Sequence, residues 1–444
     1  MTILLCILIV SLSAGISLAA TYGDAHQHNI IAIAWCAQSV VWGFLIWRIA
    51  VVPSHTPRTR WVLLASLAAS MIVLFPATDV LSDDAHRYRW DGWVQTHGVN
   101  PYRAAPADPA LASLHHRSDG VTYPESINNN TLQTIYPPGA QYVFASIVRC
   151  CGTSPLGFKS GWIALCAVII AASVIMLWSN DRLLALYLAV LLSPVYLLHG
   201  MMDIHVDIVM GLVVMLSLIA MQRAGWTSKL ASSIYGYAIT LKYLPLLLLP
   251  AFVQLRASSK KETLQRILII TATIALLYMP FVSANVLGSL GAFTSAWQAN
   301  SLLAWIGNLV FDPSITRIVL MLCAAVMMLG IVIMWREHVL WCCSMVVLTL
   351  MVFSPVVHAW YIALPLMLWI PAPSRTPIVW GVSMCVYGLT YANYKGNGVW
   401  FDNPVALGFE YIPVMIAFAI DVWRGPLLLR DQHGVSLTSS SDRK

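Results

Sequence analysis

The chain has 444 residues, of which 59% are hydrophobic and 10% are charged, and its mean hydropathy is +0.74. A soluble domain carries roughly 25% charged residues, so this composition excludes an ordinary soluble protein. The formal net charge of +6 is an excess that basic residues at cytoplasmic helix ends produce by themselves, and it requires no nucleic-acid partner. We therefore predict an all-α, polytopic membrane protein, because lipid offers no hydrogen-bond partner for backbone groups outside a helix.

Eleven apolar runs are candidate membrane spans, since a span needs roughly 17–25 apolar residues. The first run lacks the basic start of a signal peptide, so we interpret it as a retained helix. Residues 230–255 contain Lys242 and two prolines, which is typical of a broken helix or a hairpin of short helices, and residues 360–372 are short. We expect about 12–14 transmembrane helices in total. The eleven runs are residues 3–20, 30–52, 61–80, 160–178, 183–199, 206–222, 266–283, 314–335, 339–356, 376–393 and 406–423.

The basic residues divide the loops between two sides of the membrane. Placing the basic loops in the cytoplasm satisfies the positive-inside rule, provided that residues 230–255 enter and leave on the same side. We expect one integral domain over residues 1–430 and a polar cytoplasmic tail over 431–444. The long first loop should carry a short interfacial helix at 136–148. The segments predicted to lie outside the cytoplasm are 81–159, 199–207, 284–313, 354–361 and 394–403.

The long loop begins with LSDDAHRYRWDGW, directly after an apolar run. If this segment is helical, Asp84, Tyr88 and Asp91 share one face, and Asp83 and Arg87 share the next. Asp83 would then pair with Arg87 and leave Asp84 free. Ionisable groups at membrane depth are costly, so they often mark a site. The alternative is that these acids and arginines only solvate the end of a helix.

HGMMDIHVD, at residues 199–207, brings His199, Asp203, His205 and Asp207 to the end of a span on the same predicted side. The alternative is an ordinary polar turn. The spacing of the last His and Asp suggests metal ligands, but the sequence identifies no third ligand. The sequence therefore neither supports nor excludes binding of a divalent metal.

SPVVHAWY, at residues 354–361, places a proline break, His358, Trp360 and Tyr361 at another span end on that side. Aromatic residues also gather at membrane interfaces for packing reasons alone, and this is the alternative. Lys242 would reach the same side if its hairpin points that way. The sequence thus predicts that several ionisable and aromatic groups converge outside the cytoplasm.

Two stretches of the first loop, SDDAHRYRWDGWVQTHGVNPY and TIYPPGAQYVFA, resemble the first extracytoplasmic loop of bacterial GT-C superfamily glycosyltransferases. More narrowly, they resemble the polyprenyl-phosphate-mannose-dependent mannosyltransferases. HVDIVMGL, LKYLPLLLLP and SPVVHAWY match later landmarks in the expected order, so the resemblance covers roughly residues 61–395. The resemblance implies an inner-membrane enzyme of the cell envelope. Its site would lie at the extracytoplasmic membrane surface, and its donor would be a sugar, mannose favoured, on a polyprenyl phosphate.

The family's catalytic base is an Asp followed four residues later by Tyr, which implies Asp84 here, with Asp83 as the second choice. The leaving phosphate needs no general acid, so one carboxylate is enough for an inverting transfer. An apolar groove between spans would hold the prenyl chain, and the acceptor could be a lipid, a polysaccharide or a protein. The expected substrate-binding residues are Arg87, Tyr88, Arg89, Asp91, Tyr136, His205, Asp207, Lys242, His358, Trp360 and Tyr361.

A membrane transporter of a glycan or a lipid-linked substrate is the main alternative, because broken helices and intramembrane charges are also found in transporters. Against it, the sequence shows no inverted repeat, and its largest polar segment is an external loop. A scaffold protein would spread polar residues over both sides. A lipid-linked glycan polymerase or ligase would be an enzyme with a larger acceptor.

Overall fold

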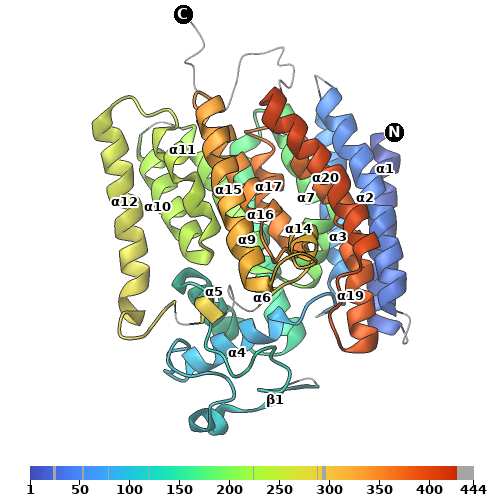
Figure 1. Cartoon of the computed structure of the whole chain (residues 1–444), viewed down its shortest axis with the longest axis vertical. Coiled ribbons are helices and arrows are strands. Elements are labelled where there is room, and N and C mark those ends of the chain that lie inside the picture. The colour runs from blue at the N-terminus through green and yellow to red at the C-terminus, as the bar shows by residue number, and fades with distance from the viewer. Residues whose placement is uncertain are drawn as a thin grey trace, which may run out of the picture.

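The computed structural model describes residues 1–23, 27–52, 55–78, 80–118, 120–223, 225–287, 289–292 and 297–427. It is a bundle of helices with a compact cap at one end, and the cap contains a hairpin of two-residue strands, β1 (Arg117–Ser118) and β2 (Val121–Thr122) (Figure 1). The all-α prediction is confirmed. The predicted tail, 431–444, lies outside the described residues.

Three helices form the N-terminal side of the bundle: α1 (Thr2–Tyr22), α2 (Gln27–Val51) and α3 (Pro57–Leu74). The fully buried Gln38 of α2 donates from Nε2 to Ser13 Oγ of α1 at 2.8 Å. Such a bond fastens two helices to each other where lipid offers no hydrogen-bond partner.

The long loop folds into the cap, which comprises α4 (Asp84–Thr96), a 3₁₀ turn η1 (Pro109–Leu114), the hairpin and α5 (Pro138–Cys151). The helix expected over 136–148 is therefore present as α5. The cap has a small apolar core of its own, formed by Trp90, Val94, Leu111, Tyr123 and Ile127. We call the end of the bundle that carries the cap the loop face, and the end where the C-terminal helix α20 stops the opposite face (Figure 1).

The central helices are α6 (Pro155–Leu177), α7 (Asp181–Leu191), α8 (Pro194–Tyr196), a π-helical turn η2 (Leu197–Met202) and α9 (Val206–Met221). The predicted span 183–199 is bent by 61° between Leu191 and Pro194. Pro194 lacks an N–H to continue the helix, and Ser193 Oγ instead accepts from the backbone N–H of Tyr196. The bend thus turns the first part of HGMMDIHVD, residues 199–202, away from the axis of α7.

Residues 230–255 form the expected hairpin. Helix α10 (Trp226–Leu241) runs to the loop face, and η3 (Leu244–Leu248) and α11 (Leu249–Gln254) return (Figure 1). Lys242 ends α10 in an extended conformation, with φ −158° and ψ 148°. This break exposes the lysine side chain at the loop face. Helix α12 (Lys260–Tyr278) and the turn η4 (Met279–Phe281) follow.

The C-terminal part continues the pattern of long and short helices. Residues 376–393, expected as one span, form two helices that are interrupted at Met384 and Cys385. The elements of this part are α14 (Leu302–Gly307), α15 (Pro313–Trp335), α16 (Val339–Val352), η5 (Ala359–Ile362), α17 (Ala363–Leu368), α18 (Thr376–Ser383), α19 (Val386–Asn397) and α20 (Pro404–Arg424).

Within the described residues, seven helices are long and apolar enough to cross a membrane, or eight if the bent pair counts as one span. The described residues therefore contain fewer full-length membrane-spanning helices than the 12–14 transmembrane helices expected. The reason lies in the centre of the bundle. Helix α9 has 16 residues and is buried along nearly its whole length, so protein rather than lipid surrounds it. A helix packed in this way can stop short of the lipid boundary.

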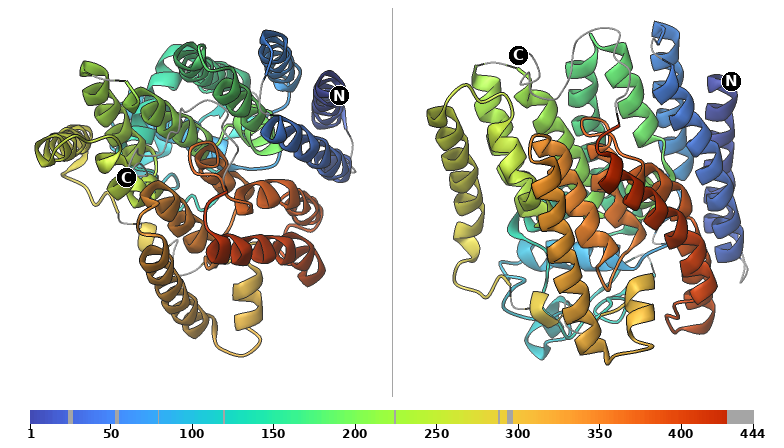
Figure 2. Two further views of the ribbon diagram at one scale, coloured as in Figure 1. Left: turned by 90° about the horizontal axis from the view of Figure 1, so that it is seen from above. Right: turned by 45° about the horizontal axis from the view of Figure 1, so that its top comes forward.

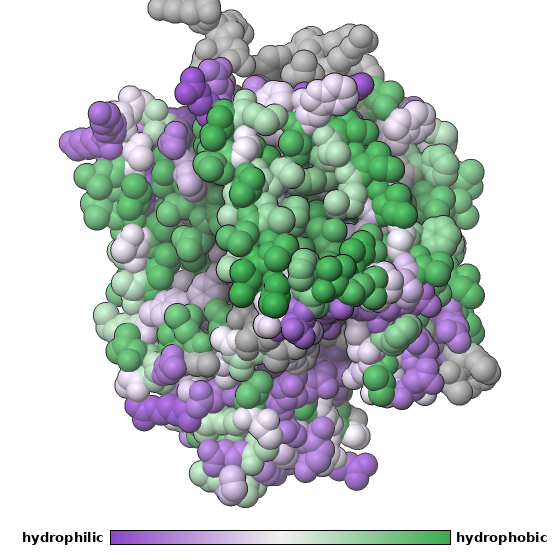
Figure 3. Space-filling view, in the orientation of Figure 1, coloured by the Kyte–Doolittle hydropathy of each residue, from purple (hydrophilic) through white to green (hydrophobic). Residues whose placement is uncertain are grey.

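The outer surface matches a multi-pass membrane protein. A belt of hydrophobic residues separates hydrophilic regions at the two ends of the molecule (Figure 3). Seen from above, α12 and α15 stand at the edge of the bundle (Figure 2). In an apolar stretch of 18 residues from each of these two spans, only 17% of the residues are buried within the protein. Such bare apolar helices require lipid around them.

Candidate functional site

Asp84 opens α4 at the loop face, where a carboxylate is favoured by the helix dipole. Its side chain is 31% exposed. Oδ2 accepts a hydrogen bond from Tyr136 Oη at 3.3 Å and lies 3.5 Å from His205 Nδ1. The start of α4, the segment before α5 and the start of α9 therefore converge on this one carboxylate.

Lys242 and Asp207 form an ion pair in the same region. The ammonium Nζ of Lys242 lies 2.7 Å from both oxygens of Asp207, whose side chain is only 1% exposed. The same nitrogen lies 4.3 Å from the centre of the Tyr361 ring, a cation–π distance. Lys242 remains 27% exposed, so its charge can still meet a ligand.

Two imidazoles stack on the indole of Trp360. The His205 ring centroid lies 3.6 Å from that of Trp360, and the His358 centroid lies 4.6 Å from it, each nearly parallel to the indole. His358 Nδ1 also lies 3.0 Å from the hydroxyl of Tyr387. Stacking and this hydrogen bond hold both imidazoles in fixed orientations.

Burial and the neighbouring charges shift the pKa of two titratable groups of the site, Asp84 and His358. Burial raises the pKa of the Asp84 carboxyl, but its contact with His205 and the charges of His358 and Lys242 lower that pKa more, so it lies below its usual value. Burial lowers the pKa of His358 to about 4. At neutral pH the site therefore presents an ionised Asp84 and a neutral His358. His358, expected to bind substrate, therefore adds no positive charge to the site at neutral pH, whereas Lys242 does.

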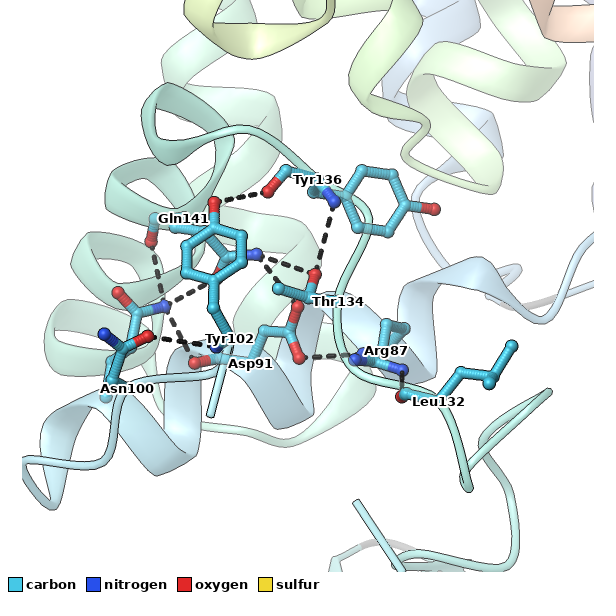
Figure 4. A network of polar contacts seen from close by, with 9 residues as sticks. Arg87, Asp91, Asn100, Tyr102, Leu132, Thr134, Tyr136 and Gln141 are labelled. Carbon is cyan, nitrogen blue, oxygen red and sulfur yellow. Dashed lines mark hydrogen bonds and ion pairs between the residues drawn. The ribbon is translucent and has the colours of Figure 1, made fainter. Parts of the chain in front are cut away.

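Arg87 and Asp91 stabilise the cap and do not join Asp84. Arg87 Nε donates to Asp91 Oδ1 at 2.8 Å, and its Nη1 donates to the Leu132 carbonyl at 2.9 Å (Figure 4). The expected pair of Asp83 and Arg87 is therefore wrong. Asp91 lies almost two turns farther along α4 than Asp84, where α5 packs, and it accepts from Gln141 Nε2 at 2.9 Å.

The same network orients Tyr136. Its backbone N–H donates to Thr134 Oγ1 at 3.3 Å, and its carbonyl accepts from Tyr102 Oη at 2.6 Å (Figure 4). With its backbone held in this way, the phenol reaches Asp84. The polar residues of the cap thus position the Tyr136 hydroxyl that contacts Asp84, and they do not touch the Asp84 carboxylate themselves.

Tyr88 and Arg89, also expected to bind substrate, are buried in the cap. The Tyr88 ring stacks on Phe144 at 4.5 Å between centroids and meets Tyr136 edge-on at 5.0 Å. Arg89 is 1% exposed, and its Nη2 lies 2.7 Å from His86 Nδ1. Both side chains pack or bond within the protein. Tyr88 therefore packs against Tyr136, whose hydroxyl contacts Asp84, and Arg89 is part of the cap.

Asp83, the second choice as base, is engaged elsewhere. Its Oδ1 lies 2.8 Å from Lys395 Nζ, and its Oδ2 accepts from Asn128 Nδ2 at 3.3 Å. Lys395 belongs to α19 and was not among the expected residues. The only hint to it was that residues 394–403 were placed on the same side as the loop.

A second set of residues missing from the sequence prediction supports SPVVHAWY. Fully buried Glu410 of α20 accepts from Asn300 Nδ2 at 3.1 Å and from Trp380 Nε1 at 3.0 Å. The neighbouring Ala299 carbonyl accepts from the backbone N–H of Val357 at 2.9 Å. Glu410 is thereby linked, through Asn300 and Ala299, to Val357, the residue before His358. An acid inside an apolar run was the signal that could have found it.

His199 and Asp203 connect the cap to the bundle. Both are fully buried, and His199 Nδ1 lies 3.7 Å from Asp203 Oδ2. Asp203 Oδ1 accepts from the backbone N–H groups of Val80 and Leu81, at 2.9 and 3.1 Å. These residues position the start of the loop. Among the described residues, no group of three or more His, Cys, Asp or Glu side chains is arranged to hold a metal ion.

Neither a scan against protein-family models nor a search of curated proteins found a match to this chain. What the site can do is therefore argued from its geometry. It combines the partly exposed carboxylate of Asp84, the ammonium of Lys242 beside a second carboxylate, and two imidazoles in fixed orientations, all at helix ends on the loop face. Such a set can take a proton from a hydroxyl and stabilise an anion close by.

Proposed function

We propose that the protein is an integral-membrane glycosyltransferase. It moves a sugar, mannose favoured, from a polyprenyl phosphate to a lipid or glycan acceptor on the extracytoplasmic side of the inner membrane. The observation that carries this proposal is the position of Asp84. Its ionised, 31% exposed carboxylate stands 3.5 Å from His205, in the same cluster as Lys242. A base and a cation side by side at the membrane boundary suit a substrate whose reactive phosphate ester lies there.

Asp84 acts as the general base in this scheme. Its carboxylate takes the proton of the acceptor hydroxyl while that oxygen attacks the anomeric carbon of the donor sugar. The bond between the anomeric carbon and the phosphate oxygen breaks, its electron pair leaves with the polyprenyl phosphate, and the configuration inverts. General-base assistance contributes about 10²–10⁴-fold to such a step. The phosphate departs as a stable anion and needs no proton from the enzyme.

Lys242 stabilises the leaving phosphate. An ammonium group has three N–H donors, and two of those on Lys242 are directed at the oxygens of Asp207. The third is left for a phosphate oxygen on the exposed side. Asp207 and the Tyr361 ring hold the ammonium in place before substrate arrives, which is the condition for electrostatic stabilisation of an anion.

The membrane supplies the rest of the donor site. A polyprenyl chain gains free energy for every methylene kept in lipid, so only the sugar phosphate needs to rise to the loop face. The helix ends at Asp207 and Lys242 stand where such a head group would emerge. The polyprenyl chain therefore does not have to leave the lipid to reach the site.

The bend of 61° between Leu191 and Pro194 and the hairpin at Lys242 favour transport as a second candidate, because discontinuous helices build transporter sites. In this chain, however, the interruptions bring charged residues to helix ends at the loop face. A transporter site would instead be expected near the middle of the membrane.

The test uses the full-length protein reconstituted in lipid vesicles with radiolabelled polyprenyl-phosphate mannose and membrane lipid extract as acceptor. We expect label to pass to an acceptor, and we expect the Asp84→Asn variant to lose this transfer. Glu125→Gln, an exposed acid of the same loop, is the matched control and should retain it. Movement of intact donor or glycan across the vesicle membrane, equal in the wild type and Asp84→Asn, would replace the proposal with transport.

A further inference from the structure

A second polar site lies on the opposite face, away from Asp84. A pocket of about 410 Å³ opens between the end of α9, the start of α10, the end of α11 and the first turns of α12. Four cationic side chains line it, together with a single acid. These residues are Arg223, Lys229, Arg256, Arg266 and Glu262.

The pocket carries an excess of positive charge. Its one carboxylate, Glu262, already accepts from Arg266 Nη2 at 2.6 Å and from the Ser258 backbone N–H and hydroxyl, both at 2.9 Å. Lys229 and Arg223 are exposed, and the one side-chain hydrogen bond that Arg223 makes among the described residues runs from Nη2 to the Met176 carbonyl, at 3.0 Å. The cations thus outnumber the acid by three, counting four against one.

Arg266 provides a donor that the protein does not use. The residue is 3% exposed, and its Nη1 donates to the Leu255 carbonyl at 2.6 Å. Its buried Nε–H finds no acceptor in the part of the chain that the structure describes. An unsatisfied buried donor costs free energy, and an anion in the pocket beside this guanidinium would offset part of that cost.

Arg256 is held over the pocket by an unusual backbone. Its φ of +55° is in the left-handed region, which non-glycine residues rarely adopt. Its Nη1 lies 3.2 Å from both the carbonyl and the side-chain oxygen of Gln222, at the end of α9. The turn after α11 therefore brings the exposed guanidinium of Arg256 to the end of the neighbouring helix α9.

We propose that this pocket binds the phosphate of an anionic membrane lipid. Basic pockets between helix ends are suited to such phosphates. A lipid is favoured over a soluble phosphate because the pocket adjoins a helix that faces lipid. Only Arg266 and Ile270 of α12 are buried, and Leu264 and Leu268, on another side of this helix from the pocket, are 56% and 59% exposed. Acyl chains can pack along this exposed apolar helix while the phosphate meets the arginines.

The inference does not depend on glycosyl transfer, and its test measures binding only. Purified full-length protein in neutral detergent is titrated with phosphatidylglycerol, and the thermal unfolding midpoint is followed. Phosphatidylcholine, glycerol phosphate and inorganic phosphate are the comparison ligands. We expect phosphatidylglycerol to raise the midpoint at concentrations at which the other three have no effect.

Variants locate the site. Lys229→Gln/Arg256→Gln removes two pocket charges, and Lys260→Gln/Lys261→Gln removes two exposed charges of α12 that do not line the pocket. Each cation near an anionic lipid contributes roughly fivefold to affinity, so the first variant should bind phosphatidylglycerol about 25-fold more weakly. The second variant should bind it like the wild type.

Three results would overturn the proposal: no effect of phosphatidylglycerol on the wild type, equal losses in the two double variants, or an equal response to inorganic phosphate. If Lys229→Gln/Arg256→Gln does not fold, the single variant Lys229→Gln replaces it, because this exposed lysine makes no ion pair among the described residues. An affinity loss of about fivefold in that variant supports the pocket, and an unchanged affinity contradicts it.

Discussion

The ammonium of Lys242 lies 2.7 Å from both carboxylate oxygens of Asp207, which joins the end of α10 to the start of α9. The two partners differ in solvent contact, since the side chain of Asp207 is 1% exposed and that of Lys242 is 27% exposed. Removal of one partner therefore has a different cost from removal of the other, because only the lysine can turn to water.

We expect Lys242→Ala to lower the free energy of unfolding by about 3–5 kcal/mol, since it leaves a buried carboxylate without its cation. Asp207→Asn should cost less, and Lys242→Ala/Asp207→Asn should recover much of the loss. Thermal and denaturant unfolding of the three variants in detergent, read as a double-mutant cycle, measures this coupling. Strictly additive losses would show that the pair does not act as a unit.

We expect Asp84→Asn to reduce transfer by at least about 10²-fold, because the carboxylate that takes the proton is gone. Unfolding should change little, since the side chain is 31% exposed and an amide oxygen can still accept from Tyr136. Initial rates and unfolding midpoints check the two statements. Asp83→Asn breaks the ion pair with Lys395, and exposed pairs are worth about 1 kcal/mol or less. A larger rate loss in Asp83→Asn than in Asp84→Asn would move the base to Asp83.

The pH dependence follows from the lowered pKa of Asp84. A carboxylate with a lowered pKa stays ionised at neutral and mildly acidic pH, and it is protonated only as the pH falls through its folded-state pKa, which lies below the usual value of an aspartate. Its contribution to stability is present above the unfolded-state pKa and is lost over the same fall in pH. Because the pKa of His358 is about 4, this imidazole gains its proton in the same low range.

We therefore expect kcat/KM to be flat from about pH 8 to about pH 5 as far as Asp84 and His358 are concerned. Initial rates at low donor concentration measure it. His358→Gln serves as the control, since the profile above about pH 5 should keep its shape in that variant. An acid limb centred near pH 6 that persists in His358→Gln would mean that the base is not a carboxylate with a lowered pKa.

Arg87 should matter to the cap and not to the donor. We expect Arg87→Met to make the first loop sensitive to limited proteolysis, because Asp91 is 1% exposed and loses the cation that neutralises it. The KM for the donor should stay within about twofold of the wild type in protein that remains folded. Proteolysis rates and donor kinetics measured on the same preparation test this. A raised donor KM with an intact loop would return Arg87 to the site.

The convergence of Asp84, His205, Asp207, Lys242 and His358 could be anticipated from charge topology. Ionisable residues sat at span ends that the basic loops assigned to one side, and the structure brings these five together. The hairpin around Lys242 could be anticipated as well, because two prolines follow a polar residue in an apolar run.

The partner of Arg87 could not be predicted from the sequence. This residue has an acid four positions before it, Asp83, and another four positions after it, Asp91, and helix geometry alone does not choose between them. The choice is made by Gln141 of α5, which holds Asp91 from a distance of 50 residues along the chain. Glu410 and Asn300, 110 residues apart, were missed for the same reason.

The number of full-length spans was overestimated because hydropathy measures composition and not surroundings. An apolar run such as 206–222 has the length of a span, yet its helix stops after 16 residues and lies among other helices. The rule of roughly 17–25 residues applies to a segment that must reach both lipid boundaries by itself. Helices enclosed by protein are free of that constraint.

Gly139 of α5 has a consequence for engineering. A Cβ at this position would stand 2.7 Å from the backbone oxygen of Thr240, so the first turn of α5 rests directly on the last turn of α10. Thr240 is two residues before Lys242. If the first loop were exchanged for that of another protein, a larger residue in place of Gly139 would displace the end of α10 and with it Lys242. A chimaera should therefore take α5 and α10 from the same protein.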